Sequence, residues 1–338
     1  MISERYDLWE TGEYDYPVAF GFIPNLVGYL HEDMEKRPCI LVVPGGGYCV
    51  VSPTEGEIVA LEFYKKGYNT FVCTYTTNLF GIAPLLDQPM KDLSRAIRYI
   101  RANAGAFHVK ENELTICGFS AGGHLCGSVC VHYEDVKDEN PKYSAISNRP
   151  DAAILSYPVI TSGEKAHRGS FESLLGKDAS EEQLSYMSLE KHVTPDTPPC
   201  FLWQTATDET VPVENSYLFA EACRANGVSY AHHVFSKGKH GLSLANEEWA
   251  SGNFGGQYTV EQIECQVEAA EEGVLPLPEE AVARIKKEFG MRKKEECSEE
   301  KKRKPMSGLI TERASWKNVR LSLENMTKNL ASTRSNPV

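Results

Sequence analysis

Residues 114–125 of the chain read LTICGFSAGGHL. The apolar run that begins this stretch predicts a strand, and the glycines around Ser120 predict a sharp turn into a helix. A serine on such a turn needs strained backbone angles, so the residues two positions away must have almost no side chain, as Gly118 and Gly122 do. This pattern is typical of a nucleophile elbow, which lifts the serine hydroxyl above the sheet. A G-x-S-x-G match alone arises by chance in many chains, so the residues around it decide its value.

Short apolar or β-branched runs alternate with helical patterns through the first two thirds of the chain. This alternation predicts an α/β fold, a mostly parallel, twisted sheet with helices on both faces. The expected strands cover residues 40–43, 70–74, 114–117, 152–157, 200–204 and 230–235. The expected helices cover residues 57–66 and 215–225, and a third lies in the amphipathic stretch around 86–100.

Two later loops carry the partners that the serine needs. A serine hydroxyl is a poor nucleophile at neutral pH, so it requires a histidine as base and a carboxylate that holds this histidine in the useful tautomer. Asp208 follows the expected strand 200–204, and His240 lies in a glycine-flanked loop after the last expected strand. This order, with each residue just beyond a strand end, predicts that Ser120, Asp208 and His240 form a catalytic triad.

Other residues compete for the roles of acid and base. Glu209 is adjacent to Asp208 but lies farther from the strand end. His124 follows the elbow on the same expected helix, so a structural role is expected for it. Four histidines in polar stretches are expected to face solvent, and two lie within an expected strand. The first set is His31, His108, His132 and His192, and the second is His232 and His233.

A glycine-rich stretch, PGGGY at 44–48, directly follows the expected strand 40–43. Glycines let backbone N–H groups approach the oxygen that becomes negative during acyl transfer, so we assign the N–H groups of Gly46, Gly47 and Ala121 to an oxyanion hole. A phosphate-binding loop is disfavoured, because G-x-G-x-x-G is absent and no Gly-Lys-Ser/Thr follows. Tyr48 is expected to line the substrate pocket, with an ordinary buried tyrosine as the alternative.

The chain divides into a catalytic domain and additional segments. Residues 1–245 are expected to form the catalytic domain, in which residues 161–199 form a lid-like helical insertion, because they separate two core strands by far more than a usual connection. Residues 246–307 are charged and helix-prone, which favours a solvated helix and linker, with a dimer contact as the alternative. Residues 308–338 are expected to form a final helix that packs on the catalytic domain.

The composition of the 338 residues excludes several classes of function. A hydrophobic fraction of 41% suffices for one large core, and a net charge of −12 argues against nucleic acid or an anionic membrane as partner. No apolar run approaches the roughly 18 residues of a membrane-spanning helix. The N-terminal residues lack the apolar stretch of a secretory signal, so a cytoplasmic location is expected. Ten scattered cysteines without metal-ligand spacing predict reduced thiols and no metal site.

Five of these motifs together resemble one group of proteins. They are the stretches 44–48, 118–125, 157–160, 208–212 and 237–243. The chain is similar to bacterial carboxylesterases of the α/β-hydrolase fold that are described as acetyl esterases or acetylxylan-esterase-like, within the lipase/esterase superfamily. One departure is Pro44, which stands where the broader family often has histidine, so this loop must be braced differently.

The resemblance implies a serine esterase without a cofactor. It would remove acetyl or another short acyl group from an alcohol, such as an acetylated sugar or a xylo-oligosaccharide. The resemblance also implies that Tyr157 contacts substrate and that the insertion with His167 and Arg168 lies over the site. An amide hydrolase of the same fold, a non-catalytic binding protein and an acyl transferase to an alcohol remain alternatives. Whether the chain forms a homo-oligomer is left open.

Overall fold

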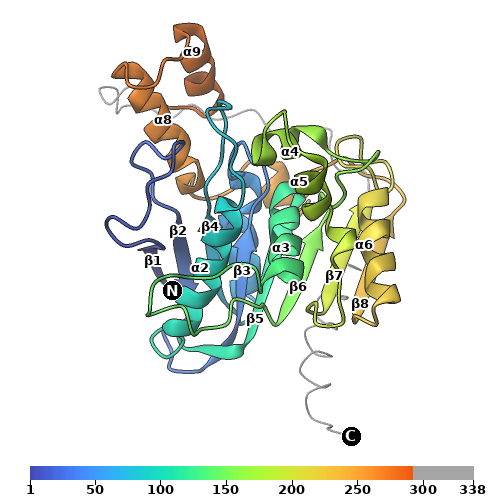
Figure 1. Cartoon of the computed structure of the whole chain (residues 1–338). Helices are drawn as coiled ribbons and strands as arrows, with labels where there is room; N and C mark the ends of the chain where they lie inside the picture. The colour runs from blue at the N-terminus through green and yellow to red at the C-terminus, as the bar shows by residue number, and fades with distance from the viewer. Residues whose placement is uncertain (292–338) are drawn as a thin grey trace, which may run out of the picture.

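A computed structural model describes residues 1–291. They fold around one eight-stranded sheet with the strand order β1-β2-β4-β3-β5-β6-β7-β8 (Figure 1). The strands are β1 Ile2–Asp7, β2 Asn25–Leu30, β3 Arg37–Val43, β4 Asn69–Thr74, β5 Val109–Phe119, β6 Ala152–Ser156, β7 Cys200–Thr205 and β8 Tyr230–Phe235. All strands except β1 and β2 pair in parallel with one another, in the order β4-β3-β5-β6-β7-β8. The expected mostly parallel sheet is therefore confirmed.

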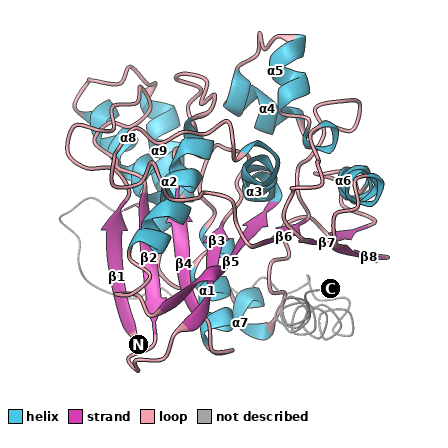
Figure 2. Cartoon of the chain, turned by 60° about the horizontal axis from the view of Figure 1, so that its bottom comes forward, coloured by secondary structure: helices cyan, strands magenta, loops and turns pink. Residues whose placement is uncertain are grey.

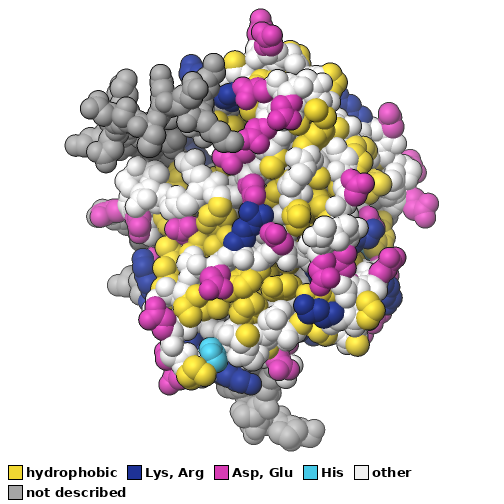
Figure 3. Space-filling model, turned by 90° about the vertical axis from the view of Figure 1, so that its left-hand side faces the viewer, with side chains coloured by type: hydrophobic (Ala, Val, Ile, Leu, Met, Phe, Trp, Pro, Cys, Tyr) yellow, Lys and Arg dark blue, Asp and Glu magenta, His cyan; other side chains and the backbone are white. Residues whose placement is uncertain are grey.

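Strands β1 and β2 were not expected from the sequence, and both are antiparallel additions at one edge of the sheet. Nearly every residue of β1 is exposed, and its sequence, ISERYD, has the charged side chains of an edge strand. Charged side chains on an edge strand discourage pairing with a further strand. Figure 3 shows this side of the molecule, where acidic and basic side chains interrupt a hydrophobic area.

Helices cover both faces of the sheet (Figure 2). One face is covered by α1 (Glu57–Tyr64) and α7 (Glu247–Ala250), and the other by α2 (Gln88–Ala102), α3 (Ser120–His132) and α6 (Glu214–Ala225). Successive side chains of a strand point to opposite faces. In β3, Leu41 and Val43 therefore enter the core beneath α2 and α3, whereas Ile40 and Val42 enter the core beneath α1. No helix within residues 1–291 is long and apolar enough to cross a membrane.

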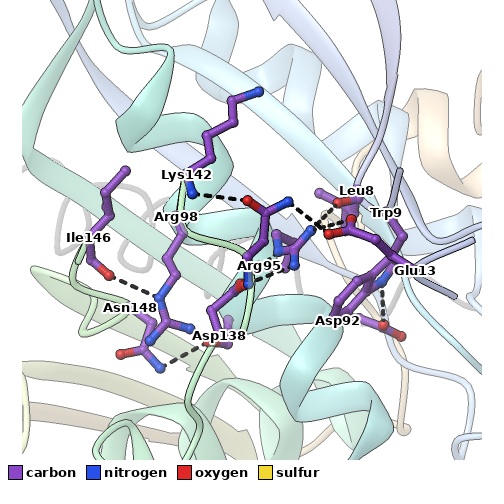
Figure 4. A network of polar contacts seen from close by, with 12 residues as sticks. Leu8, Trp9, Glu13, Asp92, Arg95, Arg98, Asp138, Lys142, Ile146 and Asn148 are labelled. Atoms are coloured by element: carbon purple, nitrogen blue, oxygen red, sulfur yellow. Dashed lines mark hydrogen bonds and ion pairs between the residues drawn. The ribbon is translucent and has the colours of Figure 1, made fainter. Parts of the chain in front are cut away.

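Arg95 on α2 ties the N-terminal segment to the body of the domain (Figure 4). Its guanidinium forms two hydrogen bonds to Asp138, of 2.6 and 2.8 Å, and donates to the Leu8 carbonyl and to Glu13. It also lies 4.2 Å from the centre of the Trp9 ring. A cavity of about 430 Å³ lies beside this network, away from the ends of the strands that carry the predicted triad.

The insertion at residues 161–199 forms α4 (Arg168–Leu175), α5 (Glu181–Tyr186) and the short turn η2 (Leu189–Lys191). It lies beside α3 toward the end of the sheet where the parallel strands finish (Figure 1). His132 was expected to face solvent, but it is 4% exposed, because the Tyr186 ring stacks on it at 3.9 Å and the Tyr186 carbonyl accepts from its Nε2. That expectation was wrong, since the insertion covers this end of α3.

Residues 247–291 are docked on the core instead of forming a solvated linker. They include η3 (Tyr258–Val260), α8 (Glu261–Glu271) and α9 (Glu279–Glu288). Gln262 is buried, and its side-chain oxygen accepts the Thr77 N–H at 2.8 Å, while its nitrogen donates to the carbonyls of Thr77 and Val18. Residues 292–307 and the expected final helix within 308–338 lie outside the described residues.

Candidate active site

The elbow serine opens α3 directly after β5, with a φ of +53°. A Cβ at Gly118 would lie 2.3 Å from the Gly122 carbonyl oxygen, and one at Gly122 would lie 2.2 Å from the Val43 carbonyl oxygen. Both distances are far too short for a side chain, so only glycine fits at either position. The strand, turn and helix predicted around Ser120 are therefore confirmed.

The structure brings the three predicted triad residues together. The Ser120 hydroxyl lies 2.8 Å from His240 Nε2, and Asp208 Oδ2 accepts from His240 Nδ1 at 2.7 Å. The other carboxylate oxygen of Asp208 accepts the N–H groups of Thr210 and Val211, each at 2.9 Å. With its carboxylate oriented from both sides, Asp208 fixes the His240 tautomer in which Nδ1 carries the proton and Nε2 is the acceptor that faces the Ser120 hydroxyl.

The parallel sheet brings these loops to one place. Asp208 follows β7 and His240 follows β8, so both lie beyond the same edge of the sheet as the elbow after β5. The acid and histidine loops are also joined directly, because the Gly238 N–H donates to Thr207 Oγ1 at 2.9 Å and the Thr207 hydroxyl lies 3.0 Å from the Gly238 carbonyl oxygen. The distance between Asp208 and His240 is thus set by the contacts of the Thr207 hydroxyl with the Gly238 backbone as well as by their own hydrogen bond.

The glycine loop lies against the elbow. A Cβ at Gly45 would lie 2.9 Å from Ser120 Cβ. Among the described residues, no backbone hydrogen bond outside the helices and strands uses the N–H of Gly46 or Gly47. The N–H of Ala121, in the first turn of α3, has no partner within its helix. These three N–H groups remain our candidates for the oxyanion hole.

Tyr48 braces the glycine loop instead of lining the substrate pocket. Its side chain is 1% exposed, and its hydroxyl lies 2.8 Å from Nδ1 of the buried His124. Since His124 Nε2 bonds to the Met187 carbonyl at 2.9 Å, Nε2 carries the proton and Nδ1 accepts from Tyr48. Burial lowers the pKa of His124 to about 4, which keeps the ring neutral. Tyr48 is therefore an ordinary buried tyrosine, as the alternative expectation had it, and it does not line the substrate pocket.

Glu55, a buried carboxylate beside the elbow, was not predicted from the sequence. It closes the turn η1 (Pro53–Glu55) and accepts the Gly45 N–H at 2.7 Å. An acidic residue between two turns ordinarily suggests a solvated side chain, yet Glu55 is 4% exposed. Together with Tyr48, it supplies the bracing that Pro44 cannot provide, because proline has no N–H or polar side chain.

Tyr157 also differs from the expectation. It is 2% exposed, so it does not reach the space above Ser120 where a substrate would lie. Its hydroxyl donates to Glu55 at 2.7 Å, and its ring stands edge-on to the His240 ring with the centres 5.0 Å apart. A φ of +39° directly after β6 turns this side chain into the core. Tyr157 therefore supports His240 from within the protein.

The insertion 161–199 was expected to place His167 and Arg168 over the site. His167 lies at the site, and Arg168 does not. His167 Cε1 would lie 4.0 Å from a Cβ at Gly47, and its Nδ1 bonds to the Ser170 hydroxyl at 2.8 Å. Burial, followed by the nearby charge of His240, lowers the pKa of His167, so its ring is neutral near pH 7. Arg168 instead donates to the carbonyls of Ser162 and Gly163. Within the described part of the chain, no group of His, Cys, Asp or Glu is arranged to hold a metal ion.

Comparison with known sequences gives three informative matches. A model of the BD-FAE family matches residues 29–223. The chain is 54% identical to endo-1,4-beta-xylanase B of Butyrivibrio fibrisolvens over 258 residues, which are 76% of this chain and 41% of that protein. It is 30% identical to an acetylxylan esterase of Xylanibacter ruminicola over 231 residues, which are 65% of this chain and 44% of that protein. The chain therefore spans about two fifths of the length of these curated relatives.

Solved structures agree with the sequence matches. An acetyl ester-xyloside bifunctional hydrolase from Caldicellulosiruptor lactoaceticus has a TM-score of 0.67 and 35% identity, covering 80% of this chain and 97% of its own. A carboxylesterase from Lactobacillus plantarum has a TM-score of 0.61 and 25% identity, covering 81% of this chain and 99% of its own. The α/β-hydrolase fold and the resemblance to acetylxylan esterases and carboxylesterases are thus confirmed.

Proposed function

The chain belongs to the BD-FAE family, and from that premise we propose that it is a serine esterase that removes acetyl or another short acyl group from an alcohol. Its relatives include an acetylxylan esterase and carboxylesterases, so the matched domain is that of an ester-bond hydrolase. The observation that carries the proposal is the line of hydrogen bonds from Asp208 through His240 to Ser120, of 2.7 and 2.8 Å.

The reaction has two halves. In the first, His240 Nε2 takes the proton of Ser120 as its oxygen attacks the ester carbonyl, and Asp208 stabilises the imidazolium. The N–H groups of Gly46, Gly47 and Ala121 hold the oxyanion, and its collapse breaks the ester bond while His240 gives its proton to the departing alcohol. In the second half, water attacks the acyl-enzyme by the same route and releases the acid and the free serine.

An acetylated sugar is the alcohol ester that the surroundings support best. One relative is named an acetylxylan esterase, and the solved structure with 35% identity is named for acetyl esters and xylosides. His167 adds a neutral imidazole beside the glycine loop, with Nδ1 engaged by Ser170 and, among the contacts of residues 1–291, Nε2 left to bond a sugar hydroxyl. A neutral polar group of this kind suits an uncharged sugar ring.

Glycoside hydrolysis, which two of these names also mention, has less support. It usually needs two carboxyl groups that flank the scissile bond about 5 to 10 Å apart. Asp208 is committed to His240, and Glu55 is buried against Gly45 and Tyr157. Because the chain spans 41% of the xylanase, that name covers far more protein than is matched here.

The test is hydrolysis of p-nitrophenyl acetate by the purified protein and by Ser120→Ala. We expect the variant to lose at least about 10⁴-fold in kcat and to lose labelling by a fluorophosphonate probe. Ser128→Ala, on the same helix, is the control and should keep both. A matched anilide and p-nitrophenyl xyloside test amide and glycoside hydrolysis. A Ser120→Ala protein with the full esterase rate would overturn the proposal.

A further inference from the structure

A second chain of hydrogen bonds, made by residues outside the triad, joins the glycine loop to the histidine loop. Glu55 accepts the Gly45 N–H on one oxygen and the Tyr157 O–H on the other, each at 2.7 Å. The Tyr157 hydroxyl in turn accepts the Ser243 N–H at 3.1 Å. We call these four residues, Gly45, Glu55, Tyr157 and Ser243, the Glu55 brace.

Both ends of the Glu55 brace adjoin reacting groups. At one end, Gly45 is so close to the elbow that a Cβ on it would lie 2.9 Å from Ser120 Cβ. At the other end, Ser243 lies three residues after His240 in the same loop, and the Tyr157 ring stands against the His240 ring. The brace therefore spans from the nucleophile to the base without using either side chain.

The chemistry of Glu55 suits a link between two donors. Only a carboxylate offers two acceptor oxygens that receive an N–H and an O–H at once. Burial raises the pKa of Glu55, while the hydrogen bonds from Tyr157 and Gly45 and the nearby charge of His240 oppose that rise. Burying a carboxyl group is costly unless its hydrogen bonds are satisfied, and both oxygens of Glu55 have a partner.

Asp92 shows what a buried carboxylate does when it serves the fold alone. It is fully buried and accepts hydrogen bonds from Thr76, Gln88 and Trp9, which join α2 to the N-terminal segment and to the chain after β4. None of these donors lies in a triad loop or in the glycine loop. Glu55 differs because Gly45 belongs to the glycine loop and because Tyr157 is linked to the His240 loop.

We propose that Glu55 is a positioning residue, which fixes the oxyanion loop relative to the His240 loop through Gly45 on one side and Tyr157 on the other. This inference rests on the proposed esterase function. Glu55 does not touch the substrate. It holds the N–H groups and the base at the spacing that the tetrahedral intermediate requires, so these groups need not move as charge develops on the oxygen.

The test compares Glu55→Gln, Tyr157→Phe and the double variant with Asp92→Asn as the matched buried control. With p-nitrophenyl acetate, each single brace variant should lower kcat roughly 10- to 100-fold and change KM less than about threefold, because small displacements at a site cost rate more than binding. The double variant should lower kcat no more than the worse single variant does, because both substitutions act on the same hydrogen bond between Tyr157 and Glu55. Asp92→Asn should lower the urea midpoint of unfolding and keep kcat.

Several outcomes decide against the brace. Folded Glu55→Gln and Tyr157→Phe proteins with the wild-type kcat would overturn it, and so would a double variant whose losses multiply. If Glu55→Gln does not fold, Tyr157→Phe decides alone, because it removes one oxygen and keeps the ring against His240. A wild-type protein that neither hydrolyses the ester nor reacts with the fluorophosphonate overturns the esterase function itself, and the role of Glu55 falls with it.

Discussion

Asp208 holds His240 by a hydrogen bond of 2.7 Å while its other oxygen accepts two backbone N–H groups. In Asp208→Asn the oxygen would stay with the backbone donors, and the amide nitrogen would face His240 Nδ1. That arrangement favours the wrong tautomer, with the proton on Nε2, so we expect kcat to fall about 10⁴-fold while the fold is kept. Steady-state kinetics and circular dichroism check this result. The neighbouring Glu209→Gln is the control, and a loss there with an active Asp208→Asn would identify Glu209 as the acid.

His167 should govern recognition of the alcohol. We expect His167→Ala to raise KM for acetylated xylo-oligosaccharides about tenfold, the loss of roughly one hydrogen bond, and to leave KM for p-nitrophenyl acetate within about twofold, because that ester has no sugar ring. Arg168→Ala, whose side chain bonds only to carbonyls of its own loop among the described contacts, should change neither value. An equal rise of KM for both substrates would argue against a contact with the sugar.

The glycine loop offers a matched pair of substitutions. In Gly45→Ala the new methyl group would lie 2.5 Å from the Phe119 carbonyl oxygen and 2.9 Å from Ser120 Cβ, so the loop must move and kcat should fall more than about 100-fold. In Gly47→Ala the nearest atoms are 4.0 Å away, and the residue has only the strain of a φ of +65°, about 1 kcal/mol. We expect a loss below about tenfold there. Equal losses of kcat in the two variants would show that the clash of Gly45→Ala with the elbow is not what lowers the rate.

His124 should make the protein sensitive to acid. Burial lowers its pKa to about 4 from the ordinary 6.5, so between these values the unfolded chain binds a proton that the folded chain does not. Its contribution to the free energy of unfolding is complete above pH 6.5 and falls by about 3 kcal/mol as the pH drops to 4. Urea unfolding at pH 7 and pH 4.5 measures this. His124→Gln keeps a donor for Met187 and an acceptor for Tyr48 but has no imidazole to protonate. Its free energy of unfolding should therefore fall less between pH 7 and pH 4.5 than that of the wild type, and an equal fall in both proteins would contradict the assignment.

The sequence carried enough information for the parallel sheet and for the residues that the structure gathers around Ser120. Apolar runs bounded by glycine and proline mark buried strands, and Asp208 and His240 follow such runs directly. Of the two strands that were not predicted, β1 lacks this signal because it is a charged, exposed edge strand, whereas β2 is buried and apolar and was missed despite carrying it. The roles of Tyr48, Tyr157 and Glu55 depend on which way a side chain turns after a positive φ or a tight turn, and that is set by distant contacts. A local pattern does not contain those contacts.

Gln262 has a consequence for how the molecule is made. Its side chain supplies partners for the backbone of Thr77, 185 residues earlier, and of Val18, 244 residues earlier. Until residue 262 has been synthesised, water must take the place of this side chain at the backbone groups of Thr77. The segment matched by the family ends at residue 223, before both His240 and Gln262. Truncation at that boundary would remove the base His240 and would leave the backbone of Thr77 without the partners that Gln262 provides, so the family match alone does not mark where a working domain can be cut.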